Sequence, residues 1–180
     1  MNVVIINYNA GNVQSVKNAL IRLGIDPTLS DDPEQIVKAD KVIFPGVGEA
    51  STAMEFLKER QLDVVIKSLK QPVFGVCLGL QLMCTHSEEN DTDCLGIFDV
   101  AVKRFEPKLK VPQMGWNTLE EMNSSLFKEL PQEPYVYYVH SYYAELSDYT
   151  IAKTNYINPF SAALQKDNFY ALQAHPEKSG

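Results

Sequence analysis

The segment PVFGVCLGLQLM, residues Pro72–Met83, contains the features that decide the fold. Its first part, Pro72–Val76, is a short apolar run of the kind that forms a strand covered on both faces of a sheet. Its last part, Leu78–Met83, has the pattern of a helix start. The G-x-C-x-G sequence between them places Cys77 where serine stands in a nucleophile elbow, a sharp turn from a strand into a helix.

Cys77 is therefore the candidate nucleophile. A helix N-terminus favours the thiolate over the thiol, and its free N–H groups, led by that of Leu78, can face a developing oxyanion. The alternative is a buried cysteine that fills a tight strand–helix junction, because free cysteine is among the most buried residue types. Of the other two cysteines, we expect Cys84 in the core and Cys94 at the polar loop Ser87–Asp93, without a role.

A nucleophilic cysteine needs a base. His175-Pro176-Glu177 follows the last expected strand, so Glu177 can bind one imidazole nitrogen and leave the other for the thiol. The H-x-E spacing is weak evidence alone and gains weight only beside the elbow. We expect His86 at the surface. His140 ends a strand near the same face, where a structural role is favoured.

Strands alternate with helices on both sides of this segment. Val3–Ile6 and Lys41–Phe44 are further apolar runs, and helical patterns follow each of them. This alternation predicts an α/β fold: a three-layer open sheet, mostly parallel, with helices on both faces. Ligands bind beyond the carboxyl ends of strands in such sheets. We therefore expect the site near three turns: Asn7–Gly11, Pro45–Gly48 and Gly75–Gly79.

The C-terminal half has short strands with short connections, which predicts an antiparallel extension of the sheet or a side sheet. The expected strands are Val100–Phe105, Tyr135–Val139, Thr150–Thr154, Ser161–Gln165 and Phe169–Gln173. We expect a single domain over residues 1–180, since a chain of 180 residues can bury a sizeable core.

The composition excludes several classes of protein. The chain is 45% hydrophobic and 22% charged, as in ordinary globular proteins. Its net charge of −7 is spread evenly, so neither nucleic acid nor an anionic membrane surface is an expected partner. No apolar run approaches the length of a membrane span, and the start lacks the pattern of a secretory signal. Three cysteines without framework spacing indicate a reducing compartment, so we expect a cytoplasmic location and neither metal nor cofactor.

Several segments in a fixed order resemble one family. They are Tyr8 with Gly11-Asn12, Pro45–Gly48 (PGVG), Gly75–Met83 (GVCLGLQLM), Pro112–Asn117 (PQMGWN), His140–Tyr142 and His175–Gly180 (HPEKSG). The elbow and the H-P-E sequence resemble the class I glutamine amidotransferases. PQMGWN and PGVG narrow the resemblance to the glutaminase subunits of imidazole glycerol phosphate synthase, an enzyme of histidine biosynthesis. The chain departs from the family near its start, where Asn7 and Asn9 replace the usual Asp and Gly.

The resemblance implies a reaction and a set of site residues. Cys77 attacks the glutamine amide, His175 acts as base and then acid, and Glu177 orients the imidazole; a thioester and ammonia form, and water then releases glutamate. The implied oxyanion donors are the backbone N–H groups of Leu78 and of the PGVG turn, at Val47 and Gly48. The implied glutamine-binding residues are Gly46, Gly48, Gln81, Ser141 and Tyr142.

The resemblance also implies a partner. The family passes ammonia to a cyclase subunit with a (β/α)8 barrel, which makes imidazole glycerol phosphate and AICAR. The implied interface residues are Asn12, Trp116, Asn117, Tyr137 and Lys178. Taken alone, Asn12 is explained as a helix N-cap and Tyr137 as a strand residue, whereas Trp116 lies in an expected loop and suits an exposed anchor. The family continues with a helix after HPEKSG, so we expect this chain to lack it.

Three alternatives stay open. The chain could be another class I glutaminase subunit, for example of vitamin B6 synthesis, although PQMGWN argues against that. It could be a catalytically silent interaction domain of the same fold, which predicts that a glutamine-mimicking electrophile leaves Cys77 unmodified. A redox-sensing thiol protein is the last alternative, but it has no need of Glu177 or of the PGVG turn.

Overall fold

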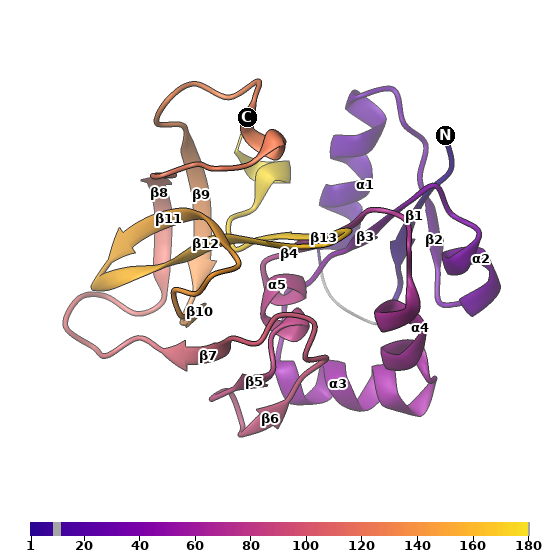
Figure 1. The fold of residues 1–180 in the computed structure, drawn as a ribbon, viewed down its shortest axis with the longest axis horizontal. Coiled ribbons are helices and arrows are strands. Elements are labelled where there is room, and N and C mark those ends of the chain that lie inside the picture. The colour runs from indigo at the N-terminus through magenta and orange to yellow at the C-terminus, as the bar shows by residue number, and fades with distance from the viewer. Residues whose placement is uncertain (9–11, 180) are drawn as a thin grey trace.

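The computed structural model describes residues 1–8 and 12–179. The expected turn at Asn7–Gly11 and the last residue of HPEKSG therefore lie partly outside the described residues. Within them, five parallel strands form one half of a large open sheet (Figure 1). In spatial order these are β2 (Thr28–Ser30), β1 (Val3–Ile6), β3 (Lys41–Phe44), β4 (Val73–Val76) and β13 (Phe169–Leu172).

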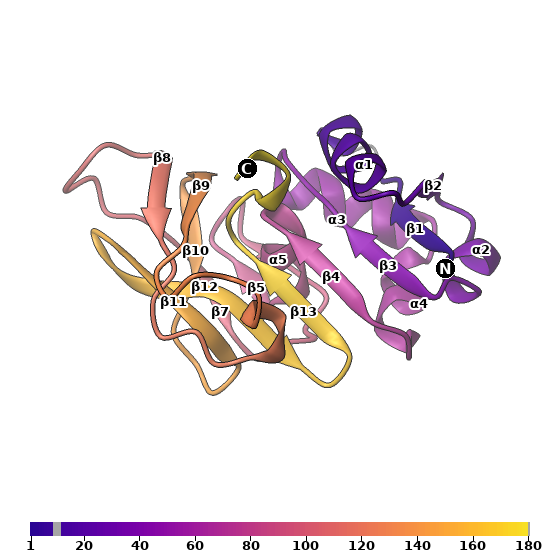
Figure 2. The same ribbon diagram turned by 90° about the horizontal axis from the view of Figure 1, so that it is seen from above.

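The sheet continues beyond β13 as the expected antiparallel extension. In order it contains β12 (Asn158–Lys166), β10 (Tyr142–Ala144), β7 (Ala101–Arg104), β5 (His86–Ser87) and β6 (Thr92–Asp93), and β11 (Thr150–Tyr156) pairs with β12. Only β5 and β7 run parallel to each other here. A separate two-stranded sheet is formed by β8 (Gln113–Thr118) and β9 (Tyr135–His140). Figure 2 shows this ribbon standing beside the extension.

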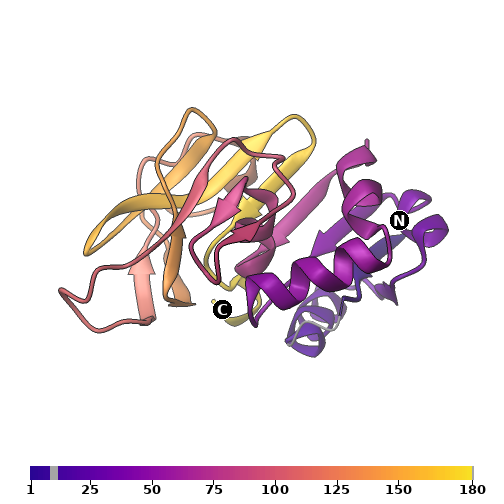
Figure 3. The same ribbon diagram turned by 90° about the horizontal axis from the view of Figure 1, so that it is seen from below.

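Helices cover both faces of the parallel half, as predicted. On one face lies α1 (Val13–Arg22), and on the other lie α3 (Ala50–Glu59), α4 (Leu62–Ser68) and α5 (Leu78–Met83) (Figures 1 and 3). The short helix α2 (Pro33–Val37) contacts β1 and α4, while the short 3-10 helices are η1 (Ser125–Phe127) and η2 (Pro176–Lys178). No helix in the described part of the chain is long and apolar enough to span a membrane.

The apolar runs form buried strands because they are covered from both sides. All four residues of Val3–Ile6 are buried, and Phe44, Leu57 and Leu80 are fully buried between the sheet and the helices. A second cluster of buried side chains, which includes Tyr138 and Phe160, fills the space between the antiparallel extension and the β8–β9 ribbon. The expected α/β architecture is confirmed.

Three details of the sequence-based prediction are wrong. Phe169–Gln173 was expected in an antiparallel extension or a side sheet, but β13 pairs in parallel with β4 at the centre of the sheet. PQMGWN was expected as a loop, but Gln113–Thr118 is a strand paired with β9. Ser87–Asp93 was expected as a polar loop, but it belongs to the β5–β6 hairpin. In each case the strand is short or its pairing partner is distant in the sequence. The local pattern therefore carries little information about which strands pair.

Gly79 allows the elbow helix to approach the neighbouring strand. A Cβ atom at this position would lie 2.0 Å from the carbonyl oxygen of Phe44, which is backbone and cannot move aside. The first turn of α5 therefore packs directly against the end of β3. This close approach brings the PGVG turn, which follows β3, next to Cys77.

We expect Gly79→Ala to lower the free energy of unfolding by about 3 kcal/mol, because the added methyl group must push two backbone segments apart. Urea denaturation followed by circular dichroism measures this loss. Gly24→Ala is the matched control: its Cβ meets nothing within 4 Å, and only its positive φ of 77° is unfavourable, at about 1 kcal/mol. Equal losses in the two variants would contradict the close-approach argument.

Candidate active site

Cys77 lies in a strained turn between β4 and α5. Its backbone has φ 52° and ψ −106°, a conformation that residues other than glycine rarely adopt. The peptide is held in place because the Cys77 N–H donates to the carbonyl oxygen of Leu172 in β13, at 2.8 Å. The residue is 6% exposed. The predicted elbow is thus present, with its thiol at the carboxyl edge of the sheet.

His175 and Glu177 follow the adjacent strand. Because β13 is parallel to β4, with Leu172 opposite Val76, both strands end at the same edge. His175 Nδ1 lies 2.8 Å from Glu177 Oε1, and the two side chains are 2% and 3% exposed. Backbone bonds fix this segment: the His175 N–H donates to the carbonyl of Tyr137, and the Lys178 N–H donates to that of His175.

The three groups affect each other's protonation. Burial lowers the pKa of His175, but its hydrogen bonds with the side chains of Cys77 and Glu177 outweigh this effect and raise the pKa to about 9. Burial raises the pKa of Glu177, but the hydrogen bond and charge of His175 outweigh it, and the pKa is lowered. The arrangement therefore favours a protonated imidazole beside an ionised carboxylate.

Asn12 serves a different purpose from the predicted one. The helix α1 begins after it, but Asn12 has φ 67° and its side chain makes no capping hydrogen bond. Instead, its amide nitrogen donates to Glu177 Oε1. The expectation of a side-chain cap is therefore wrong, because the amide is already bonded to a buried carboxylate. Within the described residues, Glu177 Oε2 is buried and has no hydrogen-bond partner.

A cleft of about 320 Å³ opens in front of Cys77 and His175. Most of the residues predicted from the sequence to form the site line it: Val47, Gly48, Leu78, Gln81, Ser141, Tyr142 and also Lys178. Gly46 does not line it. A Cβ on Gly46 would meet Tyr8 and Leu78, so this residue is packed beneath the cleft wall. The structure thus gathers residues from six separate segments around one thiol.

The PGVG turn forms one wall of the cleft. The hydroxyl of Tyr8 donates to the carbonyl of Pro45, which fastens the start of the turn. The Leu78 N–H donates to the carbonyl of Gly46 at 3.2 Å. The expected oxyanion donor is therefore not free here, because the turn itself occupies it.

Gln81 forms the floor of the cleft. Its amide nitrogen donates to the carbonyl of Tyr142 and to Gln173 Oε1, both at 3.0 Å. Gln173 in turn donates to Cys77 Sγ at 3.5 Å. His140 is buried close by and bonds the carbonyl of Tyr142 and the side chain of Gln113, and burial lowers its pKa to about 4. The structural role expected for His140 fits these contacts.

Comparison with known proteins identifies the family. A family model described as glutamine amidotransferase class-I matches residues 4–180. The chain is 60% identical to the imidazole glycerol phosphate synthase subunit HisH of Bacteroides thetaiotaomicron and 47% identical to that of Escherichia coli. Both alignments cover 100% of this chain and 93% of the relative. The chain belongs to the class I glutamine amidotransferases.

The fold agrees with this family. A crystal structure of a glutamine amidotransferase superposes with a TM-score of 0.77 at 20% identity, and the match covers 98% of this chain and 91% of that one. At this identity the likeness shows the shared fold alone.

Two residues of the site were missed in the sequence. Glu89 lines it from the turn of the β5–β6 hairpin, and burial raises the pKa of its carboxyl. Gln173 follows β13 and contacts the thiol. No motif or spacing marks either residue, since long-range pairing of strands brings Glu89 to the cleft and Gln173 to the thiol. Among the described residues, no cluster of His, Cys, Asp or Glu is arranged to hold a metal ion.

The predicted interface residues are divided between two places. Trp116 is 55% exposed and packs edge-on against Tyr137, with ring centroids 5.9 Å apart, on the β8–β9 ribbon. Asn117 lies on the same ribbon, where its side chain donates to the carbonyl of Asn155. Lys178 lines the cleft, and Asn12 donates to Glu177, which does not line it.

In an NMR titration of the folded chain, we expect His175 to keep its second ring proton up to about pH 9, while His140 stays neutral down to about pH 4. The pKa of His175 is raised from 6.5 on folding, so its proton stabilises the fold fully below pH 6.5, and this stabilisation is lost as the pH rises through 9. Glu177→Gln should lower the pKa of His175 and leave that of His140 low. A His175 pKa at or below 6.5 in the unmodified chain would contradict the assignment.

Proposed function

We propose that this chain is the glutaminase subunit of an imidazole glycerol phosphate synthase. It hydrolyses glutamine to glutamate and ammonia, and the ammonia passes to a cyclase subunit in histidine biosynthesis. The observation that carries the proposal is the buried His175–Glu177 pair beside a cysteine at a strained elbow. The 60% identity to a HisH subunit favours this particular synthase over other members of the family.

In the first half of the reaction, the Cys77 sulfur attacks the side-chain amide carbon of glutamine. His175 holds the proton that came from the Cys77 thiol and gives it to the leaving nitrogen, so that ammonia departs and a γ-glutamyl thioester remains. In the second half, His175 takes a proton from water, and the hydroxide breaks the thioester to release glutamate. Glu177 holds the imidazole through its Nδ1 atom and stabilises the imidazolium that forms in each half.

Each half passes through a tetrahedral intermediate with a negative oxygen. The Leu78 N–H and a backbone N–H of the PGVG turn, at Val47 or Gly48, are the donors that can stabilise it. Because Leu78 now donates to Gly46, the turn must change its conformation before both donors face the oxyanion. This rearrangement makes low activity of the isolated chain an expected property.

The charges around the cleft suit the amino-acid end of glutamine. Glu89 is an acidic side chain of the cleft and is held 2.8 Å from the Ala50 N–H, so its carboxylate is fixed. We assign to it the α-ammonium group of the substrate. Ser141 and Tyr142 line the same end, and Gln81 keeps their segment in place through the carbonyl of Tyr142.

The β8–β9 ribbon is the surface that we assign to the cyclase, which in this family is a (β/α)8 barrel. Met114, Trp116 and Tyr135 are all more than half exposed on it, which suits an anchor for a partner. Tyr137 connects the ribbon to the site, since its carbonyl accepts the His175 N–H and its own N–H donates to Ser179. Ammonia is protonated in water, so the route to the cyclase must be sealed. We place the reaction in the cytoplasm.

We expect very little glutamate release by the isolated chain and a large increase when the cyclase and its ligand are both added. A coupled glutamate dehydrogenase assay measures both rates. Cys77→Ala should reduce the activated rate by roughly 10³-fold or more while the chain stays folded, because the nucleophile is lost. Cys94→Ala, which removes a thiol outside the cleft, is the matched control and should keep its activity.

Each contrary result points to another function. Full activity without the cyclase would contradict the gated turn. Activation by a different synthase in place of the cyclase would favour another glutaminase subunit, such as that of vitamin B6 synthesis. Failure of a glutamine-mimicking electrophile to modify Cys77 in the complex would favour a silent interaction domain.

A further inference from the structure

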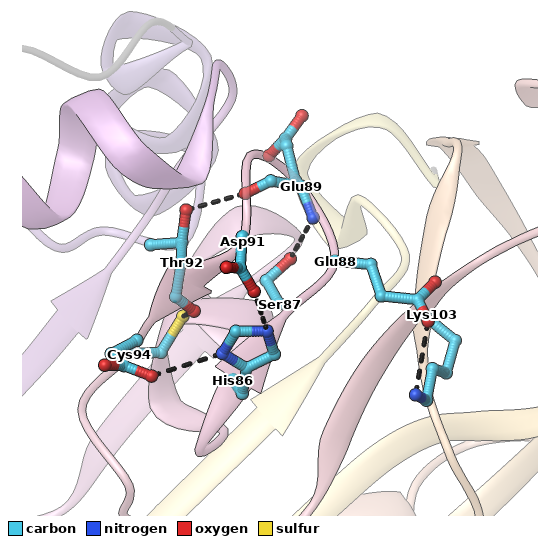
Figure 4. Close-up of polar contacts among 9 residues, drawn as sticks. His86, Ser87, Glu88, Glu89, Asp91, Thr92, Cys94 and Lys103 are labelled. Carbon is cyan, nitrogen blue, oxygen red and sulfur yellow. Dashed lines mark hydrogen bonds and ion pairs between the residues drawn. The ribbon is translucent and has the colours of Figure 1, made fainter.

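Polar contacts join the two strands and the turn of the β5–β6 hairpin, as Figure 4 shows. His86 lies between Asp91 and Asp93, with nitrogen–oxygen distances of 3.1 and 3.2 Å. The backbone of Glu89 is bonded on both sides, through the hydroxyls of Ser87 and Thr92. The tip of this hairpin is therefore a fixed structure and not a loose loop.

The hairpin is also fastened to the sheet. The Glu88 carboxylate accepts the Arg104 N–H at 2.7 Å and pairs with Lys103 at 3.2 Å, both on β7. These two contacts lie on the side of the hairpin away from the cleft residue Glu89. The hairpin thus has a fixed base, from which its tip can hold another segment.

The tip holds the start of α3. Glu89 Oε2 accepts the Ala50 N–H at 2.8 Å, and the side chain of Asn90 donates to Glu49 and contacts the Ser51 hydroxyl at 3.3 Å. The helix has no side-chain cap of its own, since Glu49 makes no capping hydrogen bond to its backbone. Its first N–H is capped instead by a residue 39 positions away.

These contacts lie directly after the PGVG turn. The start of the turn is fastened by Tyr8 and by the packing of Gly46. Gly48 has φ 130° and is exposed, so the end of the turn depends on what holds the residues that follow it. In the described chain, the hairpin tip supplies the long-range side-chain contacts to that segment.

We infer that the hairpin tip, Glu89 and Asn90, positions the Val47–Gly48 part of the turn for glutamine hydrolysis. This inference rests on the proposed function and deepens it: Glu89 faces the substrate and also holds α3, whereas Asn90 only holds α3. Burial and the negative charge of Glu49 both disfavour an ionised carboxylate at Glu89. The ammonium group of bound glutamine offsets both effects. Substrate binding therefore strengthens the bond to Ala50 and orders the end of the turn.

The two residues make different kinetic predictions. Asn90 does not line the cleft, so Asn90→Asp should leave the KM for glutamine within about twofold of its original value. It places a second carboxylate against Glu49, and the displaced turn should lower kcat by roughly tenfold, since small misplacements of catalytic groups are costly. Aspartate tolerates the positive φ of 52° at this position nearly as well as asparagine, so the backbone is not disturbed.

A double variant that exchanges the carboxylate and the amide between positions 49 and 90 tests whether this contact restores kcat. In the Glu49→Gln/Asn90→Asp double variant, the new amide at position 49 donates to the new carboxylate at position 90 and restores the contact. We expect kcat to recover to within about threefold of the original value, while Glu49→Gln alone changes it little. Glu89→Gln is the contrasting variant and should raise KM, because it removes the charge that binds the ammonium group.

All variants are measured in the complex with the cyclase and its ligand, with thermal unfolding as the check on folding. An unchanged kcat in folded Asn90→Asp, or a loss that the double variant does not repair, would overturn the inference. The proposed function is tested separately in the same series, since the unmodified complex must release glutamate. If the unmodified complex releases glutamate and the Asn90 variants have the same kcat, the positioning role is contradicted while the proposed function stands.

Discussion

The parallel pairing of β13 with β4 is the interaction on which the site depends. Its register places Leu172 opposite Val76, and the carbonyl of Leu172 accepts the N–H of Cys77. The chain travels through almost one hundred residues between these strands and returns to the centre of the sheet. His175 comes to the thiol because two parallel strands end at one edge.

Two further constraints make this edge a reactive site. The positive φ of Cys77 pushes its side chain out of the sheet, and Gly79 lets the following helix pack closely enough to support that turn. The buried Glu177 keeps the imidazole of His175 charged and oriented, and Asn12 holds the same carboxylate oxygen. The backbone of Leu172 thus holds the thiol residue, the backbone of Tyr137 holds the His175 segment, and the side chain of Asn12 holds the carboxylate.

The sequence predicted the local features well and the long-range ones poorly. The apolar runs at β1, β3 and β4 and the elbow at Cys77 follow from short patterns, so they were predicted correctly. The parallel place of β13 was missed, because a strand's pattern does not name its partner. Glu89 was missed for the same reason: it reaches the cleft from a hairpin whose register depends on β7. The side chain of Asn12 was assigned to a cap because its distant partner, Glu177, was unknown.

The central claim is that Cys77 is acylated by glutamine in this cleft. The most direct measurement is acid quenching of the complex with the cyclase during turnover of isotope-labelled glutamine, followed by peptide mass spectrometry. We expect one γ-glutamyl group on the peptide that contains Cys77, and its loss when hydroxylamine cleaves the thioester. Label on another cysteine, or rapid glutamate release without any label on Cys77 under conditions that preserve thioesters, would contradict the account.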